Sequence, residues 1–184
     1  MGIDNDGNFL DDDDYIIELI FKLYPWEMFF QEDIFYSFDT NKTKWIEPIW
    51  KAALSTKAIL PILWEMFPNH PNLLPAYFDE NKITDNFVKK PIFSREGANI
   101  EIIENKKITL KTDGIYKNNG FIYQQLNKIH PIKAIETTGW EISKEVFPVL
   151  GSWIVGDEPV GICVREDIIP ITNNTSYFIP HYYD

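Results

Sequence analysis

The stretch from Phe87 to Asn99 constrains the fold and the chemistry of this chain more than any other. It reads Phe-Val-Lys-Lys-Pro-Ile-Phe-Ser-Arg-Glu-Gly-Ala-Asn, and a second apolar run begins at Ile100. Two apolar runs joined by a turn of small and charged residues predict a β-hairpin. Gly97 lets backbone N–H groups approach an anion closely, while Lys90 and Arg95 supply positive charge. The tip therefore predicts a phosphate-binding turn, and an ordinary surface hairpin with solvated charges is the alternative.

Composition limits the partners that such a site can serve. A chain of 184 residues, 45% of them hydrophobic, is long enough for one core and short for two independent domains. The formal charge of −11 argues against a broad surface for nucleic acid or anionic membrane, because such a surface needs clustered Lys and Arg. We therefore expect no nucleic-acid or membrane partner, and any anion must bind in a local basic pocket.

Compartment is predicted from cysteine usage and from the start of the chain. Cys163 is the single cysteine, so it has no internal disulfide partner, and no basic-then-apolar leader precedes the first acidic residues. Apolar runs stay below the roughly 18–20 residues that cross a bilayer. We expect a cytoplasmic protein.

The first 14 residues are rich in Asp, Asn and Gly, and Asp11 to Asp14 form a run of like charges. We expect residues 1–14 to be a mobile acidic start. Asp4, Asp6 and Asn8 have the alternate spacing of a calcium loop, but Phe9 stands where such a loop needs glycine. The pattern therefore argues against calcium.

The segment from residue 15 to about residue 70 reads as mainly helical. Residues 15–24 have a helical apolar period with Asp14 as a cap, and residues 26–32 predict a short helix with core aromatics. Residues 45–51 predict a strand that runs into a helix at Pro48, and a further helix is expected from Ser55 or Thr56, begun or kinked at Pro61. Lys57, in the expected first turn, suits an anionic partner because a helix start already carries positive charge, although a solvated lysine remains open. His70 is predicted to be a turn residue.

After Leu73 the pattern changes to strands. Residues 75–78 predict a short strand, residues 100–103 and 107–110 an antiparallel hairpin, and residues 147–155 and 159–165 a long hairpin around Gly156. Residues 121–126 predict a strand edge that ends in amides, which can hydrogen-bond a planar base. Arg165, at the end of an apolar strand, is a candidate anion contact.

Several blocks match one family in the same order, and together they cover nearly the whole chain. The chain resembles the carboxy-terminal part of the glutathionylspermidine synthase family, ligases of the ATP-grasp type. The blocks are Phe21-Lys-Leu-Tyr-Pro-Trp-Glu27, Trp45-Ile-Glu-Pro-Ile-Trp-Lys51, Lys57-Ala-Ile-Leu-Pro61, His70-Pro-Asn-Leu-Leu74, Lys90-Pro-Ile-Phe-Ser-Arg-Glu-Gly-Ala-Asn99, Ile122-Tyr-Gln-Gln125, Gly151-Ser-Trp153 and Gly161-Ile-Cys-Val-Arg-Glu-Asp167.

The resemblance implies an α+β, ATP-grasp-like fold in which ATP lies between antiparallel sheets with flanking helices. It implies that Lys57 and Lys90 bind ATP, and that Ser94 to Asn99, with Arg95 and Gly97, form a loop over the phosphates. Gln124, Gln125, Leu126 and Asn127 fall at the adenine contact, and Arg165 at the catalytic arginine. The implied reaction joins a peptide carboxylate and an amine, as with glutathione and a polyamine, through an acyl phosphate.

Departures from the family pattern bear on completeness. Ser94 stands where the family usually has Gly, and Tyr177 stands where it usually has Arg, which removes a cation. The family's amino-terminal portion, with its magnesium ligands, has no counterpart in residues 15–184, so we assign no metal ligand here. Glu166 and Asp167 are poor substitutes, because adjacent strand residues point to opposite faces.

The sequence thus predicts the ATP-binding portion of an ATP-dependent carboxylate–amine ligase that uses ATP and Mg²⁺. Two alternatives stay open: a non-catalytic nucleotide-binding remnant, and an interaction subunit completed by a separate amino-terminal chain. Apolar surface left uncovered around residues 15–30 further predicts a homo-oligomer or a partner subunit.

Overall fold

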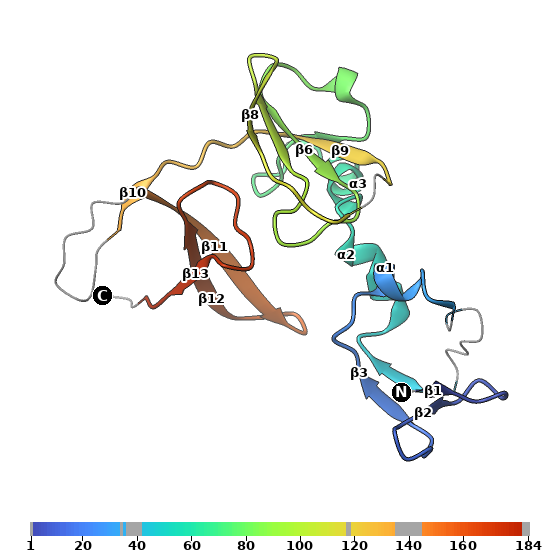
Figure 1. The fold of residues 1–184 in the computed structure, drawn as a ribbon. Helices are drawn as coiled ribbons and strands as arrows, with labels where there is room; N and C mark the ends of the chain where they lie inside the picture. Colours follow the sequence, from blue (N-terminus) through green and yellow to red (C-terminus); the bar gives the residue numbers. More distant parts are fainter. Residues whose placement is uncertain (1, 34, 36–41, 117–118, 135–144, 182–184) are drawn as a thin grey trace. The chain divides into compact units, whose positions relative to one another are not determined.

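The computed structural model describes residues 2–33, 35, 42–116, 119–134 and 145–181 (Figure 1). The chain is an α+β protein, as the sequence predicts, and it has mixed sheets and few helices. It separates into two units, Met1–Ile59 and Leu60–Asp184. Composition predicts a single core, but each unit has its own cluster of buried apolar residues.

Unit 1 consists of short elements around an aromatic core. Its elements are β1 (Gly2–Ile3), β2 (Phe9–Leu10), β3 (Leu19–Phe21), α1 (Trp26–Phe29), β4 (Lys44–Ile46), η2 (Ile49–Lys51) and α2 (Ala52–Ser55). Strands β1 and β2 are antiparallel, whereas β3 and β4 are parallel, so the expectation of antiparallel sheets alone is wrong here.

The core of unit 1 confirms the interpretation of residues 26–32 as a short helix with buried aromatics. Trp26 and Phe29 of α1 are buried together with Phe9. Trp45 of β4 meets Phe9 edge to face, with 5.3 Å between the ring centroids. Aromatic pairs of this kind add to the free energy gained from burying the rings alone.

The acidic start, residues 2–14, contains hydrogen-bonded turns, while its mobility stays a prediction. The Asp4 carboxylate accepts hydrogen bonds from the backbone N–H of Asp6 and of Asn8, at 2.9 and 2.8 Å. Asp11 accepts from the N–H groups of Asp13 and Tyr15, both at 2.9 Å. An aspartate that satisfies backbone donors in this way stabilises a tight turn.

Residues 15–24 contain a strand, β3, and the predicted helix is wrong. Ile20 pairs with Trp45 and Phe21 with Ile46, and the Lys22 N–H donates to the Ile46 carbonyl. A ten-residue helix is marginal in water, and isoleucine favours strands, so pairing with β4 prevails. Leu23 is 84% exposed, which agrees with the predicted uncovered apolar surface around residues 15–30. Oligomerisation through that surface stays a prediction.

The predictions for residues 45–70 are largely confirmed. Pro48 precedes η2, which continues into α2. The next helix, α3 (Ile59–Met66), starts later than expected but has Pro61 near its start. Lys57 therefore lies in the turn before α3 rather than in its first helical turn. His70 is a turn residue, since its Nδ1 accepts from the Asn72 N–H at 3.2 Å.

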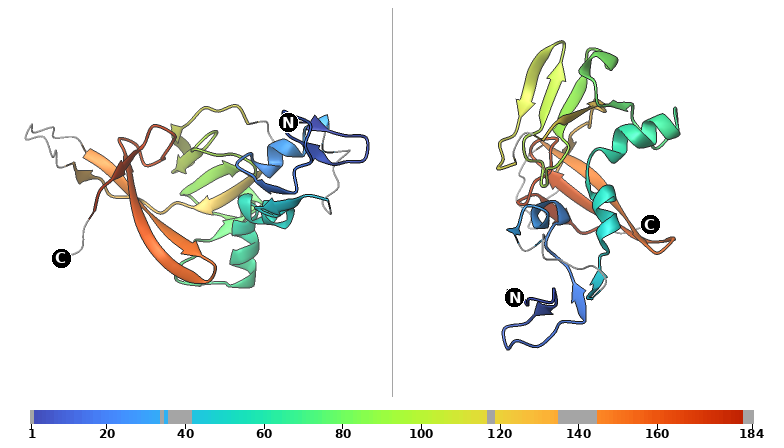
Figure 2. Two further views of the ribbon diagram at one scale, coloured as in Figure 1. Left: turned by 90° about the horizontal axis from the view of Figure 1, so that it is seen from below. Right: turned by 90° about the vertical axis from the view of Figure 1, so that its right-hand side faces the viewer.

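Unit 2 contains two antiparallel sheets. The first has the order β5-β9-β6-β7-β8 and the second the order β10-β11-β12-β13. Their bounds are β5 (Ala76–Tyr77), β6 (Phe87–Pro91), β7 (Glu101–Glu104), β8 (Lys107–Lys111), β9 (Phe121–Gln125), β10 (Ile132–Lys133), β11 (Glu145–Val155), β12 (Glu158–Asp167) and β13 (Tyr177–Ile179), and η3 (Glu80–Lys82) follows β5. The three predicted hairpins are confirmed, and β11 with β12 forms a long curved ribbon (Figure 2).

Strand alternation decides which side chains of the five-stranded sheet can share a site. Successive residues of β6 face opposite sides, so Val88 and Lys90 lie on one face and Lys89 on the other. Val88 pairs with Gln124 and Lys90 with Ile122, which places these β9 residues on the same face as the lysine. In the described part of the chain, no helix combines the length and apolar character needed to cross a bilayer.

Candidate functional site

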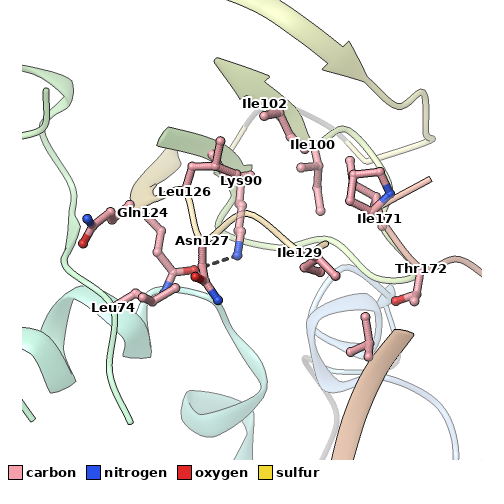
Figure 3. Close-up of a pocket in the computed structure, with 15 residues that line it drawn as sticks. Leu74, Lys90, Ile100, Ile102, Gln124, Leu126, Asn127, Ile129, Ile171 and Thr172 are labelled. Atoms are coloured by element: carbon pink, nitrogen blue, oxygen red, sulfur yellow. Dashed lines mark hydrogen bonds between the residues drawn. The ribbon is translucent and has the colours of Figure 1, made fainter. Parts of the chain in front are cut away.

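A cavity of about 360 Å³ lies in unit 2, beside the five-stranded sheet (Figure 3). This volume falls in the range of small-molecule sites, about 300–1,000 Å³. Six of the eight residues predicted to bind ATP line it: Lys90, Gly97, Gln124, Gln125, Leu126 and Asn127. The fold thus brings together six residues that the sequence selected, and ATP binding by these residues stays a prediction.

Lys90 is the principal cation of this cavity. Its side chain extends from β6 toward Gln124 (Figure 3), and Nζ donates to the Gln124 Oε1 at 2.7 Å. Burial lowers the pKa of Lys90 below that of an ordinary lysine, because desolvation disfavours the charged form. Gln124 is a neutral amide, so it leaves the ammonium charge uncompensated. A bound anion would supply the missing countercharge.

The turn between β6 and β7 places its backbone against the cavity. Glu96, Gly97 and Asn99 all have positive φ, at 58°, 68° and 56°. A Cβ at Gly97 would lie 2.5 Å from the carbonyl oxygen of Thr172 and 2.7 Å from the Ile171 Cγ2. Only glycine fits this position, since both the backbone conformation and the close approach exclude a side chain.

The amide segment is not a sheet edge, and that part of the prediction is wrong. β9 lies between β5 and β6. The backbone N–H of Gln125 donates to the Pro75 carbonyl at 2.8 Å, and that of Leu126 to the Asn86 carbonyl at 3.1 Å. Because these donors are engaged within the protein, hydrogen bonds from this segment to a planar base must come from other groups, such as the side-chain amides.

Arg165 lies near the cavity without lining it. It pairs across the β11–β12 ribbon with Val149, which does line the cavity. Its Nη2 donates to the Asn173 carbonyl, and its guanidinium lies 5.1 Å from the centroid of the Phe178 ring. Among the described residues, the buried Arg165 Nε finds no hydrogen-bond acceptor. Arg165 is therefore held in place with one donor still unsatisfied, and it stays a candidate contact for an anion.

Two other predicted residues lie outside the cavity lining. Arg95 belongs to the turn after β6 but does not line the cavity. Lys57 lies in unit 1, outside the part of the chain that forms the cavity. Their roles in binding ATP stay predictions.

The two departures from the family pattern have structural counterparts. Ser94 is buried, and its φ is not positive, so this position tolerates a side chain. Tyr177 pairs with Glu166, whereas Phe178 pairs with Arg165. Tyr177 therefore lies on the opposite face of the sheet from Arg165, so an arginine in its place would add a cation to that other face.

The described residues do not fit a magnesium site. Among them, no group of three or more His, Cys, Asp or Glu side chains converges. Asp167 accepts hydrogen bonds from the Ile168 N–H at 2.7 Å, from the Asn173 amide at 3.2 Å and from the Ser176 hydroxyl. Oxygens engaged in this way are poorly available to a hard cation, so we derive no step through magnesium.

Sequence reasoning missed most of the apolar wall and the loop that closes the cavity. The missed lining residues are Leu74, Val88, Ile100, Ile102, Ile129, Val149, Pro170, Ile171 and Thr172. Alternation from Lys90 could have found Val88 on the same strand face. The contact of Gly97 with residues 171 and 172 has no local signal in the sequence.

The fold and this cavity define an α+β protein with a cavity of small-molecule size, lined by Lys90, on one face of an antiparallel sheet. The chain belongs to the glutathionylspermidine synthase preATP-grasp family, whose model matches residues 1–184. This membership confirms the resemblance found in the sequence.

Three relatives illustrate the match. A Haemophilus influenzae protein with the provisional name acid–amine ligase is 39% identical over 95% of this chain and 44% of its own length. The trypanothione synthetase of Crithidia fasciculata is 31% identical over 73% of this chain and 19% of its own. The bifunctional glutathionylspermidine synthetase/amidase of Escherichia coli is 28% identical over 93% of this chain and 32% of its own. The chain thus spans less than half the length of these relatives.

Proposed function

We propose that this chain is the ATP-binding portion of an ATP-dependent carboxylate–amine ligase with an ATP-grasp-like site. The observation that carries the proposal is the half-buried Lys90, which faces a small-molecule cavity with a neutral amide as its hydrogen-bond partner. Among the described residues, no carboxylate forms an ion pair with it. A partly desolvated cation without a countercharge is less favourable than a solvated one, and an anionic ligand would offset that cost.

The parts of the cavity suit the parts of ATP. Lys90 would contact the phosphates, and the turn at Gly97 would bring backbone close to them. The Gln124 and Asn127 side chains would meet the base, with Leu126 and Ile102 as apolar walls. Family membership and names such as acid–amine ligase among the relatives support this reading of the site.

The proposed reaction has two steps. A substrate carboxylate oxygen attacks the γ-phosphorus of ATP, and ADP leaves to give an acyl phosphate. The amine nitrogen then attacks the acyl carbon, inorganic phosphate leaves, and the nitrogen loses a proton to give the amide. Arg165 would stabilise the negative charge that develops on the transferred phosphoryl group, since such catalysis depends mainly on positioning and electrostatics.

The substrates are proposed by analogy with the relatives. A peptide carboxylate like that of glutathione and an amine like that of a polyamine fit the names of the relatives. We propose that this chain binds ATP but does not make an amide bond alone. It spans less than half the length of the three relatives compared above, and its described residues do not fit a magnesium site.

Calorimetry with ATP tests the binding site. Lys90→Ala should weaken ATP binding roughly 10- to 100-fold, the range expected for a lost hydrogen bond to a charged group. Lys89→Ala is the matched control, because it removes a neighbouring lysine on the other face of β6. Lys57→Ala tests the second predicted lysine, and Lys90→Arg should not restore full affinity. Equal affinity of the Lys90→Ala and parent proteins would refute this site.

A turnover assay tests completeness. The purified chain is incubated with ATP, magnesium, glutathione and spermidine, and both ADP and the conjugate mass are followed. We expect no conjugate. Robust turnover would show that this chain supplies its own metal site and substrate pocket.

A further inference from the structure

The loop of residues 171–176, the last part of the connection between β12 and β13, packs directly against the turn at Gly97. The Thr172 carbonyl and the Ile171 side chain occupy the space that a Cβ at Gly97 would need. The Asn174 side-chain amide also donates a hydrogen bond to the Glu96 carboxylate. The 171–176 loop therefore forms one boundary of the predicted phosphate-binding turn.

The same loop holds Arg165. The carbonyl oxygen of Asn173 accepts a hydrogen bond from the Arg165 Nη2. The Phe178 ring, just beyond the loop, lies 5.1 Å from the guanidinium carbon. The loop thus contacts two parts of the candidate site that lie about 70 residues apart in the sequence.

The Asp167 carboxylate is the group that fixes the loop. It accepts from the Asn173 amide at 3.2 Å and from the hydroxyl of Ser176, a buried side chain. That hydroxyl in turn accepts from the Asn173 N–H at 2.7 Å, and the Asn173 Oδ1 accepts from the Thr175 N–H at 2.7 Å. Hydrogen bonds to an ionised carboxylate are stronger than those between neutral groups.

We propose that Asp167 is a positioning residue: it fixes the 171–176 loop, and the loop couples Arg165 to the turn at Gly97. The functional part of this proposal rests on the ATP site proposed above. The neighbouring Glu166 cannot play this role, because it pairs with Pro148 and Tyr177 on the opposite face of the sheet. The two adjacent carboxylates therefore have different roles, as their opposite faces on the strand require.

Amide hydrogen exchange without nucleotide tests the coupling directly. In Asp167→Ala the amides of Asn173, Thr175 and Ser176 should exchange roughly tenfold faster or more, and so should that of Ala98 in the glycine turn. The matched control Glu166→Ala should leave these rates unchanged. Ser176→Ala, which keeps the carboxylate, should give a smaller increase at the same amides. Unchanged exchange at Ala98 in Asp167→Ala, or an equal effect in Glu166→Ala, would overturn the proposal.

ATP affinity tests the effect on Arg165. Asp167→Ala and Arg165→Ala are measured singly and together. We expect the combined loss to be smaller than the product of the two separate losses, because part of the Asp167 effect acts through Arg165. Losses that multiply would show independent roles and overturn the positioning of Arg165. If the parent does not bind ATP, the proposed function fails, while the exchange rates still decide whether Asp167 couples the loop to the turn.

Discussion

Replacing Gly97 by alanine tests the close approach that shapes the cavity. The backbone at Gly97 has φ of 68°, a region that disfavours a side chain. The new Cβ would lie 2.5 Å from the Thr172 carbonyl oxygen and 2.7 Å from the Ile171 Cγ2. Since one of these contacts is with backbone, rotation of a side chain cannot relieve it.

The expected cost has two parts. The left-handed conformation costs a non-glycine residue about 1–2 kcal/mol. Forcing an extra methyl group into packed surroundings costs about 1–3 kcal/mol more. Gly97→Ala should therefore lower the free energy of unfolding by about 2–5 kcal/mol.

Gly156→Ala is the matched control for the conformational part. Gly156 has φ of 63°, and a Cβ there would meet nothing within 4 Å. It should cost only the conformational part, about 1–2 kcal/mol. Equilibrium urea unfolding of the parent and both variants gives the two differences. If Gly97→Ala costs no more than Gly156→Ala, then Ile171 and Thr172 do not confine the turn as described.

Three further predictions concern stability. Burial lowers the pKa of Lys90, so between this lowered pKa and the ordinary lysine value of 10.5 the folded state holds fewer protons than the unfolded state. The free energy of unfolding should therefore rise with pH across that window. Lys90→Met should stabilise the protein at neutral pH and flatten this rise in urea titrations. A hydrogen bond from Lys111 lowers the pKa of Glu101, and the charge of a second lysine adds to this effect. The resulting stabilisation, about 1 kcal/mol or less because Lys111 is exposed, is present above pH 4.5 and is lost as the pH falls. Glu101→Gln should therefore make the free energy of unfolding depend less on pH at acid pH. Trp26→Ala should cost about 3–5 kcal/mol in denaturant unfolding because the ring is 3% exposed, whereas Trp153→Ala, at a 58% exposed position, should cost about 0.5 kcal/mol.

The strands of unit 2 were predictable because their signals are local. Asn105 and Lys106 both have positive φ between β7 and β8, and Gly156 has positive φ between β11 and β12. Short turns of this kind fix the register of the flanking strands without help from distant residues. In the structure, alternation along β6 and its register with β9 place Lys90 and Gln124 on one face.

The failures in unit 1 have a non-local cause. Residues 19–21 read as helix because Ile and Leu recur at helical spacing, but their partners in β4 lie 25 residues further along the chain. The turns at Asp4 and Asp11 were not predicted, because the Asp, Asn and Gly content of residues 1–14 and the like charges of Asp11 to Asp14 suggested a mobile segment. In the structure each of these two carboxylates is occupied by backbone donors instead.

The candidate site also contains residues with a local sequence signal and residues whose placement depends on distant contacts. Lys90, Gly97 and the segment from Gln124 to Asn127 could be found from motif and resemblance. The role of residues 171–176 depends on contacts with Glu96 and Gly97, which lie far away in the sequence, and nothing in the composition of this loop marks those contacts. Lys57 and Arg95 remain predictions that mutagenesis can decide.

The placement of Thr172 against Gly97 also sets the order in which the cavity can arise during synthesis. The five-stranded sheet is complete once the ribosome has released Gln125, but one side of the cavity comes from residues 170–172. A nascent chain that ends before Pro170 can therefore form the sheet and leave Lys90 on an unfinished surface. Competence to bind a small molecule would appear late in translation, after the β11–β12 ribbon has emerged and folded back.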